Sequence, residues 1–345
     1  MRQILLRLPL PGTDHVLTLY GYGAMMCLGF LAAILVAARR ARGLKQPPEI
    51  IYNAALAAFF GGVFGGRLFY VIQYSGGYWH WWDIVKIWEG GLTYYGGLIV
   101  GAVAVIAYLR FARAPVLYWI DILAPSLALG LAFGRVGCFL NGCCYGAPSD
   151  LPWAFAWPVG SIPWHHYADR FLASHGAALV SFSGPHLDAA TGAAAAVWQM
   201  PRIHPSQLYS LVNALLLFVL LHLLFARKRR HGQVFFTFLL LYAVGRFLLE
   251  CTRADEAWRY LLGLPTLLKG LGMEEAAARL PGLSISQNVA IGMAIVSAAA
   301  LVWLFRSRRR ELAADYAPPV PRREADHNAS TKSGTRHGGQ KGKRR

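Results

Sequence analysis

Residues 206–251 read SQLYSLVNALLLFVLLHLLFARKRRHGQVFFTFLLLYAVGRFLLEC, two apolar runs separated by the basic cluster RKRRH. The runs, 206–226 and 233–251, are each close to the roughly 20 residues that a helix needs to cross a bilayer. A bilayer core offers the backbone no water to bond, so each run is expected to be helical. This stretch therefore predicts a helical hairpin that crosses a membrane twice.

Apolar runs of the same kind recur on both sides of this hairpin. Hydrophobic residues make up 56% of the chain, charged residues only 15%, and the mean hydropathy is +0.38, which excludes an ordinary soluble domain. The predicted fold is an all-α integral membrane protein, a bundle of about seven transmembrane helices. The other five spans are expected at about 18–38, 51–74, 92–110, 117–140 and 286–305.

Basic clusters mark alternate ends of the predicted spans. RRARGLK, RFARA, RKRRH and RSRRR follow the first, third, fifth and seventh spans, and the other connections carry no basic cluster. Because basic loops stay in the cytoplasm, the N-terminus is expected outside and the C-terminus inside. Residues 1–305 form the predicted transmembrane domain, in which 142–205 is an outer-side (periplasmic) loop domain.

Residues 306–345 form a polar, basic segment without apolar periodicity, and are expected to be a disordered cytoplasmic tail. The chain carries a net charge of +17, and this tail holds a large share of it. Anionic lipid headgroups next to the membrane account for such a charge. No nucleic-acid partner is expected.

Charged residues inside the spans gather near the outer ends. Arg67, Arg135, Arg246 and Glu250 all lie in the outer parts of their spans. Ionisable groups at membrane depth usually face the bundle interior or a water-filled cavity. Asp121 is the exception, because it lies near the cytoplasmic end and is expected to be structural or interfacial.

One helix face concentrates this polar character. Tyr242, Arg246, Glu250 and Arg253 follow one another at spacings of four, four and three residues, which places them on the same face. The simplest interpretation is a structural Arg246–Glu250 ion pair. The excess of arginine over carboxylate instead favours an anionic ligand, since arginine suits bidentate phosphate contact. Further polar residues at outer ends are Tyr22, Thr93, Tyr94, Tyr95, Asn141, His204, Ser206, Gln207 and Gln287.

Two motifs connect these residues to a known family. The run GRVGCFLNGCCYG at 134–146 resembles the signature G-R-x-G-N-F-x-N-x-E-x-x-G of the prolipoprotein diacylglyceryl transferases, and HPSQLY at 204–209 resembles their H-P-S-Q-L-Y-E. Shorter matches follow in the family's order, so the resemblance covers about 18–305. These shorter matches are Tyr22-Gly23, Gly65-Gly66-Arg67, Gly96-Gly97-Leu98-Ile99 and Arg246 to Arg253.

The resemblance implies a seven-helix bundle in the bacterial plasma (inner) membrane and a reaction without metal or organic cofactor. Enzymes of the family move the diacylglyceryl group of phosphatidylglycerol to the lipobox cysteine of a prolipoprotein, so these two molecules are the expected partners. Glycerol phosphate leaves as a thioether forms. Arginine beside the phosphate would stabilise the developing negative charge.

The matching positions give the site residues that the resemblance implies. Arg135 and Arg246 match essential arginines, and Glu250 matches the acidic partner of the second. The expected catalytic residues are Arg135, Arg246, Glu250, Tyr22 and Tyr95. The expected substrate-binding residues are Arg135, Asn141, Gly146, His204, Gln207, Tyr242, Arg253, Arg67 and Gln287.

Four positions depart from the family pattern. Cys138 replaces the signature asparagine, Cys143 its glutamate, Tyr95 the histidine often proposed as base, and Ser210 a glutamate. Tyrosine, with an unperturbed pKa near 10, is a poor base at neutral pH. The departures put the acid–base chemistry in doubt while leaving the arginines in place.

The cysteines at 138, 143 and 144 allow three interpretations: packing by small side chains, a redox pair, or a metal site that would need further ligands. Two rival functions also stay open. One is a divergent lipid-modifying transferase with another acceptor. The other is a non-catalytic lipid-binding or transport protein, although transporters often show internal repeats and midplane sites that this sequence lacks.

Overall fold

In the residues that the computed structural model describes, seven helices are long and apolar enough to cross a membrane. They are α1 (Gly21–Gly43), α2 (Glu49–Tyr74), α3 (Tyr94–Phe111), α4 (Val116–Asn141), α6 (Ser206–Arg227), α7 (Gln233–Glu250) and α10 (Ile285–Arg306). The predicted helical bundle is therefore confirmed. The structure describes residues 4–9, 16–74, 82, 85–86, 90–175, 180–181, 196–197, 199–253 and 283–306, so the predicted tail at 306–345 lies outside them except for its first residue.

Short elements accompany the spans. Strands β1 (Ile4–Pro9) and β2 (Val16–Tyr20) pair antiparallel before the first span, α5 (Ile162–His175) follows α4, and the two-residue strands β3 (Val180–Ser181) and β4 (Ala196–Val197) pair in parallel. The first span begins three residues later than predicted because residues 16–20 belong to the β1–β2 hairpin. It also ends later, at Gly43, since Arg40 stays in the helix and donates to the Ile122 carbonyl and the Ser126 hydroxyl of α4.

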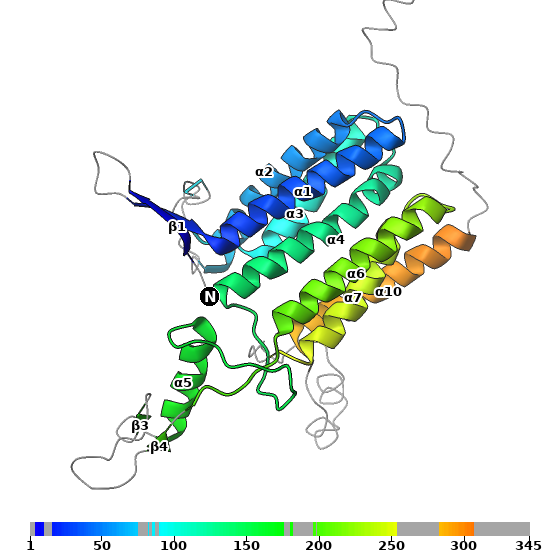
Figure 1. Cartoon of the computed structure of the whole chain (residues 1–345). Coiled ribbons are helices and arrows are strands. Elements are labelled where there is room, and N and C mark those ends of the chain that lie inside the picture. The colour runs from blue at the N-terminus through cyan, green and yellow to red at the C-terminus, as the bar shows by residue number, and fades with distance from the viewer. Residues whose placement is uncertain are drawn as a thin grey trace, which may run out of the picture.

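The long helices lie side by side, and α5 lies beyond one end of them (Figure 1). We call this the head end, where α1, α3, α6 and α10 begin and α2, α4 and α7 end. The opposite end carries the basic clusters and is called the basic end. Helix α4 is the centre of the arrangement, because it packs against α1 on one side and α6 and α7 on the other.

Glycine allows α2 and α3 to pack closely. A Cβ atom on Gly65 would lie 2.4 Å from the Val100 Cβ and 2.5 Å from the Gly96 carbonyl oxygen, and one on Gly96 would lie 2.4 Å from the Gly65 carbonyl oxygen. Neither position accepts a side chain without separating the helices. Small residues on these two spans thus allow their backbones to approach closely.

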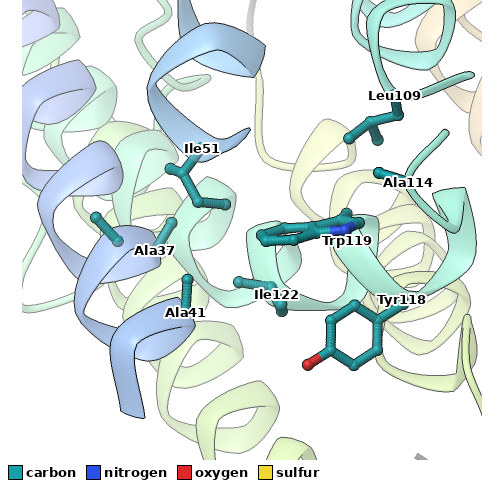
Figure 2. Packing of buried hydrophobic residues seen from close by; sticks show 9 residues of the cluster. Ala37, Ala41, Ile51, Leu109, Ala114, Tyr118, Trp119 and Ile122 are labelled. Atoms are coloured by element: carbon teal, nitrogen blue, oxygen red, sulfur yellow. The ribbon is translucent and has the colours of Figure 1, made fainter. Parts of the chain in front are cut away.

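The basic end is closed by an apolar core. Trp119 of α4 is fully buried among residues of α1, α2 and α3, including Ala37, Ile51 and Leu109 (Figure 2). A second cluster joins α4, α6 and α7 through residues such as Ala124, Leu221 and Phe238. Within the described residues, the apolar clusters of the bundle thus lie in its basic half.

At the same end, Asp121 links α4 to Lys228 and to the start of α7. It is fully buried, pairs with Lys228 Nζ at 3.1 Å, and accepts hydrogen bonds from the Gly232 and Phe235 amides at 2.9 Å each. The two amides stand at the start of α7, where helical N–H groups lack intrahelical partners. The expectation that Asp121 is structural is confirmed.

The described residues after α4 form a small apolar core of their own. Tyr145, Trp157, Tyr167, Ala168 and Ile203 pack together, and α5 contributes two of them. Backbone pairing of Ile203 with Pro148 and Phe155 joins the two ends of this segment. The 142–205 insertion predicted from the sequence therefore contains a packed core, and its assignment to the outer side is taken up below.

Candidate active site at the head end

The last turn of α7 carries an ion-pair network. Arg246 Nη2 lies 2.8 Å from Glu250 Oε2, and Arg253 Nε lies 3.9 Å from the same oxygen. The start of the seventh span completes the network, because Arg246 donates to the Ser286 hydroxyl at 2.8 Å and the Ser284 hydroxyl donates to Glu250 Oε1 at 3.0 Å. The helix face predicted from the 242–253 spacing is thus anchored to α10.

The charges of this network do not cancel. The side chain of Glu250 is 7% exposed and faces two arginines, so one carboxylate serves two guanidinium groups. A guanidinium has five N–H donors, and the contacts just described use one nitrogen of Arg246. Arg246 is therefore held in place while it retains donors for a further anion.

Arg135 brings a second positive charge to Arg246 across a small pocket. The pocket has a volume of about 20 Å³, room for about one water molecule. Its polar lining comes from α4, α6 and α7, and apolar leucine and alanine side chains complete it. The lining residues are Leu131, Arg135, Ser210, Asn213, Ala214, Leu217, Tyr242, Arg246 and Leu249.

Two tyrosines face this arginine pair from other helices. The Tyr22 phenol of α1 interacts electrostatically with Arg135. The Tyr94 phenol at the start of α3 interacts with Tyr242, Arg135 and Arg246. Tyr94 nevertheless exposes 66% of its surface, because α3 makes few contacts with α4. With the α6 residues of the pocket, five of the described helices thus bring polar groups to this region.

Tyr94 is a site candidate that the sequence prediction did not select. Tyr95 was chosen because it aligns with the family histidine, and the two residues stand about 100° apart around the helix. Their rings contact each other edge to face, with centroids 5.6 Å apart. Asn213 and Ser286 were also missed, although an amide inside an apolar span such as α6 is itself a signal.

Backbone contacts bring Gly146, His204 and Arg253 together. The Gly146 amide donates to the His204 carbonyl at 3.1 Å, the Ala147 amide donates to the Thr252 carbonyl at 2.9 Å, and Gly146 pairs with Arg253 in an antiparallel bridge. A Cβ on Gly146 would lie 2.4 Å from the His204 Cβ, which explains why glycine stands there. The His204 ring lies 3.3 Å from the Tyr209 hydroxyl.

Asn141 and Gln207 hold the turn that follows α4. Fully buried Gln207 donates to the Cys143 carbonyl at 2.9 Å, and the Ser206 hydroxyl donates to the Cys144 carbonyl at 2.7 Å. Asn141 interacts with the Cys143 thiol. These contacts are with the protein itself, so they indicate a positioning role.

The remaining two predicted residues lie at the edge of the site. Arg67 is 4% exposed, donates to the Gly90 carbonyl and stacks on Tyr70 with 5.5 Å to the ring centroid. Gln287 accepts from the Ser284 amide at 3.0 Å and contacts the Cys251 sulfur at 3.6 Å. The contacts described for Arg67 do not join it to Arg135 or Arg246, whereas Gln287 joins the α7 network through Ser284.

Comparison with known proteins places this chain in a family. The family model for prolipoprotein diacylglyceryl transferase matches residues 13–303. The chain belongs to the prolipoprotein diacylglyceryl transferase family. Membership makes it a membrane-embedded, multi-pass transferase, in agreement with its seven long apolar helices.

Curated relatives carry the name phosphatidylglycerol–prolipoprotein diacylglyceryl transferase. The relative from Clostridium tetani is 35% identical over 241 residues, 69% of this chain and 82% of its own length. Those from Burkholderia multivorans and Geobacter sulfurreducens are 32% and 31% identical, over 85% and 75% of this chain and 93% and 90% of their own lengths. The family relation therefore extends over the bundle and not only over short motifs.

Proposed function

We propose that this member of the family transfers the diacylglyceryl group of phosphatidylglycerol to a cysteine thiol in the lipobox of a prolipoprotein. The observation that carries the proposal is the convergence of Arg135 and Arg246 on one small pocket, with Arg246 fixed by Glu250 and Ser286. A phospholipid headgroup is an anion available at this depth. The names of the relatives supply the same substrate pair.

The proposed reaction is a displacement at carbon. The acceptor sulfur forms a bond to the terminal glycerol carbon of the diacylglyceryl group, and the bond from that carbon to the phosphate oxygen breaks. The electron pair leaves with glycerol phosphate, and the thiol proton passes to a base. Arginines held beside the phosphate stabilise the charge that develops on the leaving group.

The other site residues fit supporting roles. Tyr22 and Tyr94 face Arg135 and can position the headgroup, while Tyr242 lines the pocket. Gly146, His204 and Gln207 hold the segment after α4 against the end of α7, so we assign them to the shape of the acceptor side. Arg253 shares Glu250 and keeps a positive charge near this segment. Tyr95, Asn141, Arg67 and Gln287 remain proposed contributors at the rim.

The proposed orientation follows from the two ends of the bundle. The basic clusters lie opposite the site, and basic loops stay in the cytoplasm. The head end, with residues 142–205, is then at the outer face of the bacterial plasma membrane, the N-terminus outside and the C-terminus inside. A site at the outer face meets both phosphatidylglycerol and a translocated lipoprotein precursor.

A defined assay tests the transferase. The purified protein is mixed with phosphatidylglycerol micelles and a lipobox peptide, and the peptide mass is followed for addition of a diacylglyceryl group. Arg135→Ala and Arg246→Ala should abolish the mass shift, whereas Arg110→Ala, an exposed arginine at the basic end, should keep it.

Two outcomes would contradict the proposal. Lipid consumption with release of glycerol phosphate but no peptide product would indicate a transferase with another acceptor. Binding of phosphatidylglycerol by folded protein without any turnover would indicate a non-catalytic lipid-binding protein.

A further inference from the structure

Three cysteines form a thiol cluster at the end of α4. Cys138 lies in the last turn of the helix, and Cys143 and Cys144 follow the left-handed turn at Gly142. Their sulfur atoms all lie within 4.8 Å of one another. Cys144 adopts a positive φ of 59°, a conformation uncommon outside glycine, so the backbone holds this arrangement against a conformational preference.

The spacing of the sulfurs suits one shared ion. Zinc binds thiolate at about 2.3 Å, so two thiolates on the same ion stand about 3.8–4.0 Å apart in tetrahedral or trigonal geometry. The three sulfurs, all within 4.8 Å of one another, lie close to these distances. Cys138 is 8% exposed, whereas Cys143 and Cys144 are partly exposed, so one side of the cluster remains accessible.

The surroundings of the cluster are polar. The guanidinium groups of Arg253 and Arg135 both interact electrostatically with the Cys144 thiol. Thiolate is the metal-binding form of cysteine. Beside the cluster, the Gln207 amide donates to the Cys143 carbonyl, and its buried oxygen has no hydrogen-bond partner among the described residues.

We propose that Cys138, Cys143 and Cys144 bind a thiophilic divalent cation of the Zn²⁺ class, and that its fourth position, on the accessible side, binds the acceptor thiol. Three protein ligands and one open position are the usual arrangement of a reactive zinc site. The first half of this inference stands on the cluster alone. The second half rests on the proposed function.

Such an ion would promote loss of the proton from the acceptor thiol, a role for which this chain has Tyr95 in place of the family histidine. Binding to the cation releases the proton of the acceptor thiol to solvent, and the metal-bound sulfur then forms the S–C bond as the C–O bond to phosphate breaks. The cluster lies next to Arg135 and Tyr22, so the bound thiol would stand beside the proposed phosphate site. Tyr95 would then not need to act as a base.

Cobalt titration tests the metal site without reference to activity. The protein is reduced with a phosphine, freed of metal and titrated with Co²⁺, whose d–d and thiolate charge-transfer absorption reports the ligands. We expect one equivalent to bind. Each of Cys138→Ser, Cys143→Ser and Cys144→Ser should weaken binding by more than the roughly 10–100-fold caused by loss of an outer-shell partner. Cys27→Ser, which alters an exposed cysteine of α1, should leave the spectrum unchanged.

A second measurement on the unaltered chain avoids dependence on variant folding. Bound Zn²⁺ should protect three cysteines from alkylation, identified by mass spectrometry as those of the cluster, while Cys27 still reacts. Absence of one-to-one binding would overturn the proposal. So would a disulfide within the cluster that forms again in air after reduction and excludes the ion, since the cluster would then be a redox pair.

The open position is tested by adding a lipobox peptide to the Co²⁺-loaded protein. A fourth thiolate should strengthen the charge-transfer band, and the same peptide with serine in place of cysteine should not. An unchanged band would overturn the acceptor role and leave a structural metal site. If the band changes but no lipid is transferred, the proposed function fails while the metal inference holds.

Discussion

The two ends of the bundle use buried charge in opposite ways. At the basic end, Asp121 has its carboxylate oxygens occupied by Lys228 and two backbone amides, inside an apolar core. At the head end, Glu250 is shared by two arginines, and Arg135 and Arg246 line a pocket. A satisfied charge holds helices together, whereas an excess of one sign is available to a ligand. The difference separates the part of the bundle that maintains the fold from the part that we propose to be the active site.

The largest effect is expected from a substitution at the basic end. Asp121→Ala leaves Lys228 with an uncompensated charge and removes the carboxylate that accepts from the Gly232 and Phe235 amides, so we expect a loss of about 3–5 kcal/mol in the free energy of unfolding. Thermal unfolding in detergent measures the change. Asp150→Ala, which alters an exposed carboxylate, should be neutral. Equal stability of the two variants would show that the Asp121 contacts do not hold the bundle together.

The next largest effect is expected from a substitution at the head end. Arg246→Ala removes a fixed donor beside the proposed phosphate site, and we expect kcat to fall by about 10²–10³-fold, as when one oxyanion donor is lost. Peptide lipidation followed by mass spectrometry measures it, and the folded fraction should stay close to that of the unaltered protein. A rise in KM with unchanged kcat would place Arg246 in ground-state binding instead.

A smaller effect is expected from a change in the close contact between α2 and α3. Gly65→Ala forces a Cβ against Val100 and the Gly96 carbonyl, so we expect about 1–3 kcal/mol of destabilisation. Gly62→Ala is the matched control on the same helix, because its Cβ would meet nothing closer than the Gly97 carbonyl oxygen at 3.8 Å. Similar melting temperatures for both variants would show that the helices separate at little cost.

The smallest effect sharpens the assignment of the tyrosines. Tyr94→Phe removes the hydroxyl that interacts with Arg135 and Arg246, and we expect kcat/KM to fall about tenfold, or about 1.4 kcal/mol. Tyr95→Phe should change it less. The reverse order would return the role to the position that aligns with the family histidine.

Part of the fold and part of the candidate site could be predicted from particular residues of the sequence. The apolar runs predicted all seven long helices, since a segment in a bilayer must satisfy its own backbone. The 242–253 spacing predicted the Arg246–Glu250 pair, because residues four apart share a helix face. Tyr94 could not be separated from Tyr95, because the rotation of α3 depends on its glycine contact with α2.

The sequence by itself determined the number of spans, the side on which polar residues gather and the family. These properties follow from local composition and from spacing along one chain. Only the tertiary structure decided that Ser284 and Ser286 of the last span complete the Arg246 network, that Gly146 pairs with Arg253, and that three cysteines meet beside Arg135. Such contacts join segments far apart in the chain, and their geometry is set by how helices pack and turns close.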